Sequence, residues 1–401
     1  MRLKSLIKKI IPDFLLSSYH YFLSWIGAFL YWFPSKKMTV IGVTGTSGKS
    51  TVVELTARIF EDAGLKTASM SSIKFKIGDK EWENELKMTM PGRMKIQRFL
   101  RQAVKADCKY AVLEVTSEGI KQYRHKFIDF DVAVFTNLSP EHIESHGSFE
   151  KYRAAKAKLF QQVKKIHIIN IDDKNAEHFL KYSAEKKIKY GINDAGILPK
   201  DIKLLGKFNL YNAITATKIA MSQGISLETC KRALEKVKGI PGRMEIIVRE
   251  PFTVVVDYAH TPEALEQVYK TLSDRRMICV LGSCGGGRDK WKRPVLGKIA
   301  AQYCDQAIIT NEDPYDENPL KIMKDIESGF SQIPNPKSQI PKYMKILDRK
   351  EAIRQALKAA NPGDVVIVTG KGSESWMCVA HGKKIPWSDR EIVLDFFEEI
   401  E

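Results

Sequence analysis

Short apolar runs alternate with longer amphipathic stretches from residue 39 to the end of the chain. The runs are rich in Val and Ile and largely apolar, as strands buried on both faces are. The stretches between them have the periodicity of helices that bury one side. This pattern predicts parallel sheets joined by helices, an α/β fold. Strands are predicted at residues 39–41, 110–115, 132–136, 166–170, 252–257, 277–281, 306–310 and 364–369, and helices at 52–63 and 227–237.

A glycine- and proline-rich break at residues 238–242 separates two series of predicted strands. Because such residues interrupt secondary structure, we place a domain boundary there. We expect an apolar N-terminal segment (residues 1–38), a central domain with a phosphate loop and a parallel sheet (39–241) and a C-terminal Rossmann-like domain (242–401). Prolines within residues 331–341 predict a surface loop.

The segment from Phe14 to Phe33 contains no Asp, Glu, Lys or Arg. As a helix it would be just long enough to cross a bilayer. It is rich in Tyr, Trp and Phe, which prefer the headgroup region of a membrane. We expect this segment to lie on the membrane or span it; the alternative is a helix packed on the protein's own body. Basic residues flank it on both sides and leave its orientation open: Arg2, Lys4, Lys8, Lys9, Lys36 and Lys37.

The formal net charge is +16 at pH 7, from 64 Lys and Arg against 48 Asp and Glu. The lysines are scattered over predicted helix faces, and no basic stripe with interleaved aromatic residues is found, so we expect no nucleic-acid partner. We interpret the excess as a solvated surface with some attraction to anionic substrates or lipids. The six cysteines form no C-x-x-C pair, which favours core packing in a reducing cytosol over a zinc site or a disulfide framework.

A glycine-rich loop, IGVTGTSGKST at 41–51, follows the first predicted strand and precedes a predicted helix. Its inner glycines allow backbone amides to face a phosphate at the helix N-terminus, its lysine can reach the β- and γ-phosphates, and the hydroxyl that follows can bind Mg²⁺. Val43 stands where the strict motif has its first glycine, so an ordinary strand–helix turn is the alternative. The predicted nucleotide-binding residues of this loop are Gly45, Thr46, Ser47, Gly48, Lys49, Ser50 and Thr51.

Further polar groups are predicted at the ends of strands, where open α/β sheets place their ligands. Glu114 lies near the end of an otherwise apolar strand; it could be a salt-bridge partner, but beside a phosphate loop it would suit Mg²⁺. His142 and His146 follow the next strand, and their spacing predicts that they share one helical turn. We predict His142 as a second metal ligand and His146 as a structural residue.

These motifs resemble those of the Mur ligase family, the ATP-dependent amide-forming enzymes of peptidoglycan precursor synthesis, and within it the tripeptide synthetases. The similarity runs from about residue 39 to the C-terminus. Any one motif would be weak evidence, but their shared order and spacing are very improbable by chance. The motifs are VTGTSGKST, LEVTSEGI, TNLSPEHIESHG, YRAAKAKLF, LGKFNLYN, GIPGRME, VVDYAHTPEAL, GGGRDKWKRP and GKGSE.

The resemblance implies a reaction. ATP phosphorylates the carboxylate of a muramoyl-peptide acceptor, and the amine of an amino acid attacks the resulting acyl phosphate to form an amide. ATP and Mg²⁺ are the implied cofactors, and the acceptor and the amino acid are the implied partners. We further expect a monomer in the cytoplasm, attached to the inner face of the cell membrane through residues 1–38.

The resemblance also implies roles for single residues. Lys156 matches a lysine that the family carbamylates, which would turn its ammonium group into a carboxylate-like metal ligand; unmodified, it would be a surface cation of a helix at 151–160. The implied catalytic residues are Lys49, Glu114, His142 and Lys156, and the implied metal ligands are Ser50, Glu114, His142 and carbamylated Lys156. Further nucleotide contacts are implied for Asn209 (alternatively a helix N-cap), Asn212, Arg243, Asp257 and His260. The loop residues Arg288, Asp289 and Lys290 are expected at a closed domain interface.

Departures from the family pattern leave the substrate open. Tripeptide synthetases begin with a uridine-binding domain, whereas only residues 1–38 stand before the central domain here. Tyr315 replaces the arginine of enzymes that add diaminopimelate, so lysine, ornithine or another amine is open. Ser373 and Glu118 replace family histidines. The rival hypotheses are a ligase of folylpolyglutamate or cyanophycin type and a nonenzymatic nucleotide-binding scaffold at the membrane. Acidic neighbours of Tyr315 would suit a cationic side chain: Glu312, Asp313, Asp316 and Glu317.

Overall fold

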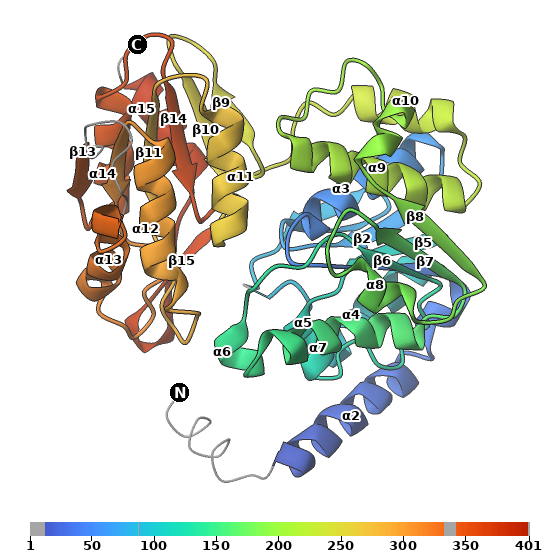
Figure 1. Ribbon diagram of the computed structural model, residues 1–401. Helices are drawn as coiled ribbons and strands as arrows, with labels where there is room; N and C mark the ends of the chain where they lie inside the picture. The colour runs from blue at the N-terminus through green and yellow to red at the C-terminus, as the bar shows by residue number, and fades with distance from the viewer. Residues whose placement is uncertain (1–12, 87, 333–341, 400–401) are drawn as a thin grey trace. The chain divides into compact units, whose positions relative to one another are not determined.

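The computed structural model describes residues 13–86, 88–332 and 342–399 (Figure 1). The basic residues that precede α2 and most of the proline-rich loop predicted at 331–341 lie outside the described residues. The chain divides into two compact units. The first is drawn from Met1–Pro140 and His146–Lys238, and the second from Glu141–Ser145 and Gly239–Glu401.

An eight-stranded sheet forms the centre of the first unit, in the order β4-β3-β2-β5-β1-β6-β7-β8. The strands from β2 to β8 in this order are parallel, and β3 and β4 add an antiparallel hairpin at one edge. Because β1 lies between β5 and β6, the loop that follows it starts at the middle of the carboxyl edge. The strands are β1 (Thr39–Thr44), β2 (Thr67–Met70), β3 (Lys74–Ile77), β4 (Lys80–Glu83), β5 (Tyr110–Glu114), β6 (Val132–Phe135), β7 (Ile166–Asn170) and β8 (Lys186–Tyr190).

Helices cover both faces of this sheet, which explains why its central strands are apolar on both sides. One face carries α3 (Lys49–Asp62), α9 (Lys207–Ser222) and α10 (Leu227–Glu235), which pack on one another. The other face carries α4 (Arg93–Lys105), α5 (Ser117–Lys121), α7 (Phe149–Gln162) and α8 (Ala176–Leu180), which share one apolar core with the strands. Shorter helical elements are η1 (Pro34–Lys37), α6 (Ile143–His146) and η2 (Ile192–Ile197).

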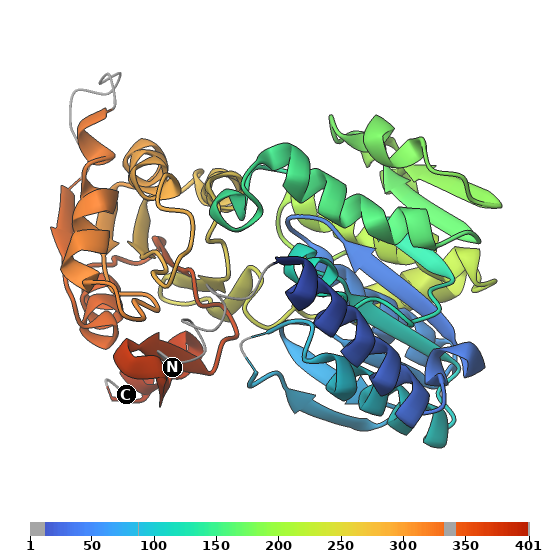
Figure 2. The same ribbon diagram turned by 90° about the horizontal axis from the view of Figure 1, so that it is seen from below.

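The apolar N-terminal segment forms α2 (Asp13–Leu30), which packs on the outside of α4 (Figure 2). Ser24 and Ala28 are buried on its inner side. The Ser24 hydroxyl donates to the Tyr123 carbonyl, and the Ser17 hydroxyl donates to the Tyr123 hydroxyl, both at 2.8 Å. One side of the segment therefore packs on the protein's own body. Within residues 13–86, 88–332 and 342–399, no helix has the length and apolar character needed to cross a membrane.

The second unit contains a six-stranded sheet in the order β13-β12-β11-β14-β10-β9, parallel except for the edge strand β9. Its strands are β9 (Glu245–Val248), β10 (Thr253–Asp257), β11 (Met277–Leu281), β12 (Gln306–Ile309), β13 (Lys342–Lys345) and β14 (Val365–Thr369), and β15 (Trp376–Val379) pairs with β16 (Lys383–Pro386). Its helical elements are α11 (Pro262–Leu272), α12 (Lys292–Tyr303), α13 (Pro319–Glu327), η3 (Phe330–Gln332), α14 (Arg349–Lys358), η4 (Ala380–Gly382) and α15 (Asp389–Glu398).

The predicted α/β fold is confirmed, and seven of the predicted strands match the observed ones to within one residue at each end. The eighth, predicted at 39–41, extends to Thr44. The helix predicted at 52–63 begins at Lys49, because Gly48 ends the loop and acts as the N-cap of α3.

Candidate active site

The glycine loop between β1 and α3 is fixed by the residues that follow β6. The N–H groups of Thr46 and Ser47 donate to the backbone and side-chain oxygens of Asn137, each at 2.9 Å. The Thr136 hydroxyl donates to the Ser47 carbonyl at 2.7 Å. Gly48 ends the loop as the N-cap of α3, so the amides of the first helical turn are left to interact with a group beyond the helix end.

No side chain fits at the two inner glycines of this loop. A Cβ atom at Gly45 would lie 1.9 Å from Thr136 Oγ1, and one at Gly48 would lie 2.3 Å from Asn212 Oδ1. Both residues also have positive φ angles, 155° and 83°. The backbone of the loop therefore lies so close to its neighbours that only glycine fits at these two positions, as in a phosphate-binding loop.

Glu114, the last residue of β5, faces the first turn of α3. Its Oε2 accepts hydrogen bonds from the Ser50 hydroxyl at 2.7 Å and from the Ser72 N–H at 3.0 Å. Its Oε1 lies 3.6 Å from Lys49 Nζ, which also donates to the Thr46 carbonyl at 2.8 Å. The structure thus brings the predicted residues Lys49, Ser50 and Glu114 together.

Lys156 is a buried residue, so its alternative interpretation as a surface cation is wrong. The side chain is 2% exposed, and Nζ donates to the Gly45 carbonyl at 2.6 Å. Nζ also lies 4.7 Å from the centre of the Tyr152 ring, whose hydroxyl contacts Thr46 Oγ1 at 3.1 Å. The end of the Lys156 side chain therefore lies at the glycine loop.

Asn209 and Asn212 are buried on α9, beside the same loop. The Asn212 amide donates to Asn209 Oδ1 at 3.1 Å, and the Asn209 amide donates to the Leu205 carbonyl at 2.7 Å. Gly206 is the N-cap of α9, so the alternative role of Asn209 as an N-cap is wrong. The Asn212 side chain lies against Gly48 of the glycine loop.

His142 and His146 do not share a helical turn, and this prediction is wrong. The short helix α6 begins at Ile143, and His142 precedes it with a φ of 57° in the left-handed region. Asp289 sets the start of this helix. Its carboxylate accepts hydrogen bonds from the N–H groups of Ile143 at 3.2 Å and Glu144 at 2.9 Å.

We call the five residues Glu141–Ser145 the strap, because they pack with the second unit while the chain on both sides belongs to the first. Besides the hydrogen bonds to Asp289, Glu144 Oε1 of the strap accepts a hydrogen bond from the Lys290 N–H at 2.9 Å. The strap therefore carries His142 within the second unit. His146 follows in the first unit, with Nε2 3.5 Å from Glu118 Oε1.

Asp257 lies at the end of β10 and organises the beginning of the second unit. Its carboxylate accepts the N–H groups of Met244 at 2.7 Å and Ala259 at 2.6 Å. Burial raises the pKa of this carboxyl group, and nearby Arg243 partly offsets that effect. Each carboxylate oxygen of Asp257 therefore accepts one backbone hydrogen bond at the end of β10.

Arg243 and His260 both lie against Tyr258. The Arg243 guanidinium lies 4.3 Å from the centre of the Tyr258 ring. His260 Nδ1 lies 2.9 Å from the Tyr258 carbonyl. Burial, together with the positive charge of Lys292, holds the pKa of His260 well below its usual value, so this imidazole is neutral at pH 7.

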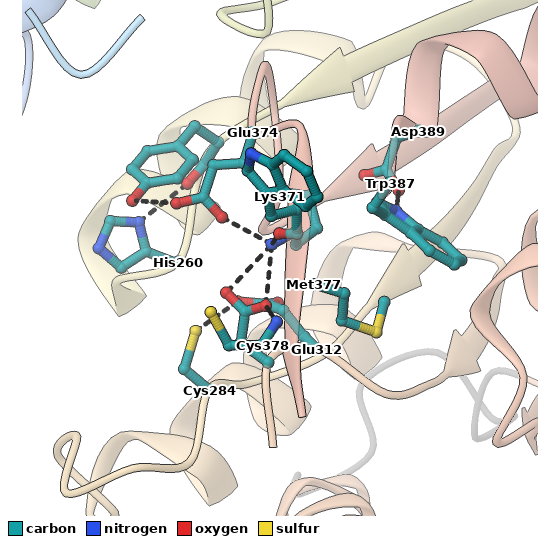
Figure 3. Close-up of polar contacts among 12 residues, drawn as sticks. His260, Cys284, Glu312, Lys371, Glu374, Met377, Cys378, Trp387 and Asp389 are labelled. Carbon is teal, nitrogen blue, oxygen red and sulfur yellow. Dashed lines mark hydrogen bonds and ion pairs between the residues drawn. The ribbon is translucent and has the colours of Figure 1, made fainter. Parts of the chain in front are cut away.

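A buried lysine cluster, shown in Figure 3, was not assigned by the sequence analysis although GKGSE was noted as a motif. Lys371 is fully buried, and its Nζ lies 3.0 Å from both carboxylate oxygens of Asp313, 2.7 Å from Glu374 Oε2 and 2.7 Å from the Trp376 carbonyl. Asp313 also accepts the Cys378 N–H at 2.7 Å. The cluster joins the loop after β12 to the loop after β14.

The acidic residues after β12 bind groups of the second unit itself. Asp316 accepts the His381 N–H at 2.7 Å, and Glu317 pairs with Arg293 at 2.9 Å. Glu312 is 2% exposed; its Oε1 lies 3.1 Å from the Cys284 thiol, and its Oε2 has no hydrogen-bond partner among the described residues. Burial raises the pKa of Glu312.

The donors beside the glycine loop fit a magnesium ion. Within the described part of the chain, no three His, Cys, Asp or Glu side chains form a cluster that could hold a metal. Ser50 and Glu114 instead offer a hydroxyl and one carboxylate, hard oxygen donors of the kind that hold Mg²⁺ when phosphate oxygens and waters complete its shell.

Comparison with known proteins agrees with this geometry. The Mur ligase middle domain matches residues 43–203, and the Mur ligase glutamate ligase domain matches residues 242–372. A UDP-N-acetylmuramoyl-L-alanyl-D-glutamate–2,6-diaminopimelate ligase of Syntrophomonas wolfei is 37% identical over 93% of this chain and 81% of its own. A UDP-N-acetylmuramyl-tripeptide synthetase of a Roseiflexus species is 35% identical over 91% of this chain and 79% of its own. A solved structure of a UDP-N-acetylmuramoyl-L-alanyl-D-glutamate–2,6-diaminopimelate ligase is 30% identical, with a TM-score of 0.59 over 90% of this chain and 79% of that chain.

Proposed function

We propose that this chain, which belongs to the Mur ligase family, adds an amino acid to a muramoyl-peptide acceptor. As a member of that family it is an ATP-dependent amide-forming ligase. The observation that carries the ATP-dependent reaction is the convergence of Lys49, Ser50 and Glu114 at the N-terminal end of α3. Relatives that are more than 30% identical over most of the chain act, by their names, on UDP-linked muramoyl peptides, which supports the acceptor class.

The proposed chemistry combines the residues around the glycine loop with the reaction that the Mur ligase family implies. The β- and γ-phosphates of ATP would lie against the first-turn amides of α3, and Lys49 would offset their charge. Mg²⁺ held by Ser50 and Glu114 would act as a Lewis acid on the phosphate oxygens. The acceptor carboxylate attacks the γ-phosphorus and ADP leaves. The neutral amine then attacks the acyl carbon, phosphate leaves, and the nitrogen loses a proton as the amide forms.

We assign the remaining site residues as follows. The proposed nucleotide contacts are Gly45, Thr46, Ser47, Gly48, Lys49, Ser50, Thr51, Asn209, Asn212, Arg243, Asp257 and His260. His142 and a carbamylated Lys156 are proposed as further metal ligands; the position of Lys156 Nζ at the Gly45 carbonyl supports a role at the loop. We place the central domain at 39–241 and the C-terminal domain at 242–401.

The amino acid is proposed to carry a cationic side chain without a second carboxylate. Tyr315, in the position where the diaminopimelate enzymes have an arginine, packs against Gly286 and offers no guanidinium. Glu312 lies three residues before it, and its buried Oε2 has no hydrogen-bond partner among the described residues. An ammonium group on the substrate would satisfy that oxygen.

A phosphate-release assay tests the proposal. Purified protein, Mg²⁺ and ATP are combined with UDP-linked muramoyl dipeptide and with lysine, ornithine or diaminopimelate in turn. We expect release that needs both acceptor and amino acid, fastest with lysine or ornithine, and none from Lys49→Ala. ATP binding without release for any pair would contradict the ligase and favour a scaffold.

Lys156 has a matched control on its own helix. Lys156→Ala should lose turnover and partly regain it with added short carboxylates, because these replace the negative charge of a carbamate. Lys158→Ala changes an exposed lysine two residues away and should leave turnover unchanged. Full activity of Lys156→Ala would contradict the carbamate role.

We also propose that the enzyme works as a monomer in the cytoplasm and attaches to the inner face of the cell membrane through residues 1–38. The exposed aromatic residues of α2 support this attachment. Sedimentation of the full chain at equilibrium measures the oligomeric state, and a dimer at micromolar concentration would contradict the monomer.

A further inference from the structure

α2 has two apolar sides, and the protein covers one of them. The outward side carries a row of aromatic residues that we call the aromatic face: Tyr19, Phe22, Trp25, Phe29 and, just beyond the helix, Trp32. The spacing of three or four residues places the four aromatic residues within α2 on one side of the helix, and Trp32 follows the helix end. Between 40% and 76% of each residue is exposed. A surface helix normally has a polar outer side, so packing within the chain does not account for this face.

The aromatic face is ordered in itself. The rings of Phe22 and Trp25 stack with centroids 5.9 Å apart, and those of Trp25 and Phe29 stack at 5.4 Å. The opposite side is fixed to the first unit through the hydrogen bonds of Ser17 and Ser24 with Tyr123, and a Cβ atom at Gly27 would lie 3.1 Å from Met94 Sδ. The helix therefore presents a preformed apolar ridge rather than a loose tail.

The elements next to this ridge are rich in basic residues. Lys36 and Lys37 in η1 are exposed, and α4 adds Arg93, Lys95, Arg98, Arg101 and Lys105, so that α2, η1 and α4 together hold seven basic residues against one acidic residue, Asp13. Such a charge disfavours a second copy of the chain as occupant, because two like-charged surfaces would repel. It favours an anionic one.

From these observations we infer that the aromatic face is a docking surface for an anionic lipid bilayer, with α2 lying in the plane of the headgroups. Trp, Tyr and Phe favour that depth, and Lys and Arg beside them are drawn to anionic lipids. α2 has 18 residues and is roughly 27 Å long, short of the hydrocarbon core, and one side is occupied by protein, so it docks without crossing. The inference rests on the membrane attachment proposed above and not on the ligase reaction.

Vesicle co-sedimentation of the full chain tests the inference. We expect binding to phosphatidylcholine vesicles that contain phosphatidylglycerol, weaker binding to phosphatidylcholine alone, and loss of the difference at high salt. Trp25→Ser with Phe29→Ser should weaken partitioning by about tenfold, which corresponds to about 1.4 kcal/mol. Lys36→Glu with Lys37→Glu should weaken binding to the anionic vesicles alone. The matched control is Leu320→Ser in α13, because Leu320 is as exposed as Phe29, at 58%.

Three results would overturn the inference. The wild-type chain could stay in the supernatant with both vesicle types, the Trp25/Phe29 variant could bind as well as the wild type, or the wild type could be a dimer that this variant dissociates, which would make the face a contact between copies. ATP-dependent phosphate release, measured on the same preparations, reports separately on the ligase. Active protein that ignores vesicles therefore contradicts the docking surface alone.

Discussion

Glu141 and Lys292 form a buried ion pair, with 3.3 Å between Oε1 and Nζ and about one twentieth or less of each side chain exposed. Glu141 begins the strap, and His142 follows it directly. The second carboxylate oxygen of Glu141 has no hydrogen-bond partner among the described residues, and burial raises the pKa of this group despite the nearby ammonium. The pair is thus the buried end of the contact between the strap and the first residue of α12.

Removal of one partner should destabilise the protein more than removal of both. Lys292→Met leaves the Glu141 carboxylate buried without its counter-charge, which costs about 3–5 kcal/mol, whereas Glu141→Leu with Lys292→Met leaves no buried charge and should recover much of that loss. Urea unfolding measures both. Equal losses in the single and double variants would show that the ion pair itself does not matter.

The same variants test whether the strap positions His142. If His142 binds the metal as proposed, Lys292→Met should raise the Mg²⁺ concentration needed for half-maximal ATP turnover, because the residue before His142 loses its anchor. Asp289→Asn, which weakens the start of α6, should act in the same direction. An unchanged Mg²⁺ requirement in both variants would contradict this role.

Glu114→Gln should separate nucleotide binding from catalysis. The amide keeps the size of the side chain but removes the charge that faces Ser50 and Lys49, so we expect turnover to fall about 100-fold or more while ATP still binds. Glu54→Gln is the control, because Glu54 is also a buried carboxylate of the first unit but pairs with Lys74 at 3.4 Å. Glu54→Gln should keep both its turnover and its Mg²⁺ requirement. Equal turnover in Glu114→Gln and wild type would remove Glu114 from the site.

Local patterns predicted much of the fold and part of the site. Runs of apolar residues located the central strands because both faces of each sheet are covered, and the loop sequence placed Lys49 and Ser50 because a strand, two glycines and a helix fix them locally. The conformation of His142 could not be predicted, since Asp289, which sets it, lies far along the chain. The burial of Lys156 was equally hidden, because Lys151 and Lys158 on the same helix look alike in sequence and are exposed.

Gly48→Ala should abolish nucleotide binding for a steric reason. The new Cβ atom would lie 2.3 Å from Asn212 Oδ1, in a residue with a φ of 83°, so either the loop or the buried Asn212 side chain must move. Gly64→Ala isolates the backbone effect, because Gly64 has a φ of 76° but no atom within 4 Å of the added Cβ. We expect Gly64→Ala to cost about 1–2 kcal/mol of stability and leave ATP affinity unchanged. Similar ATP affinity in the two variants would argue against a close fit at the loop.

His125 should make the stability of the protein depend on pH. It is 1% exposed, and neither ring nitrogen has a hydrogen-bond partner among the described residues. Burial, with Lys126 and Lys158 nearby, lowers its pKa to about 3. Between about pH 6.5 and pH 3 the unfolded chain therefore binds a proton that the folded chain does not, so stability falls as the pH falls through this range, by roughly 1.4 kcal/mol per unit.

His125→Leu removes this titration and keeps an apolar side chain of similar size in the site. The difference in the free energy of unfolding between variant and wild type, measured in urea at pH 7.5 and pH 5, should shift in favour of the variant by about 2 kcal/mol on acidification. The comparison within each pH cancels the carboxylates that titrate in both proteins. If the difference stays constant from pH 7.5 to pH 5, His125 binds its proton equally well in the folded and unfolded chains, and the folded site must provide a partner for the imidazolium.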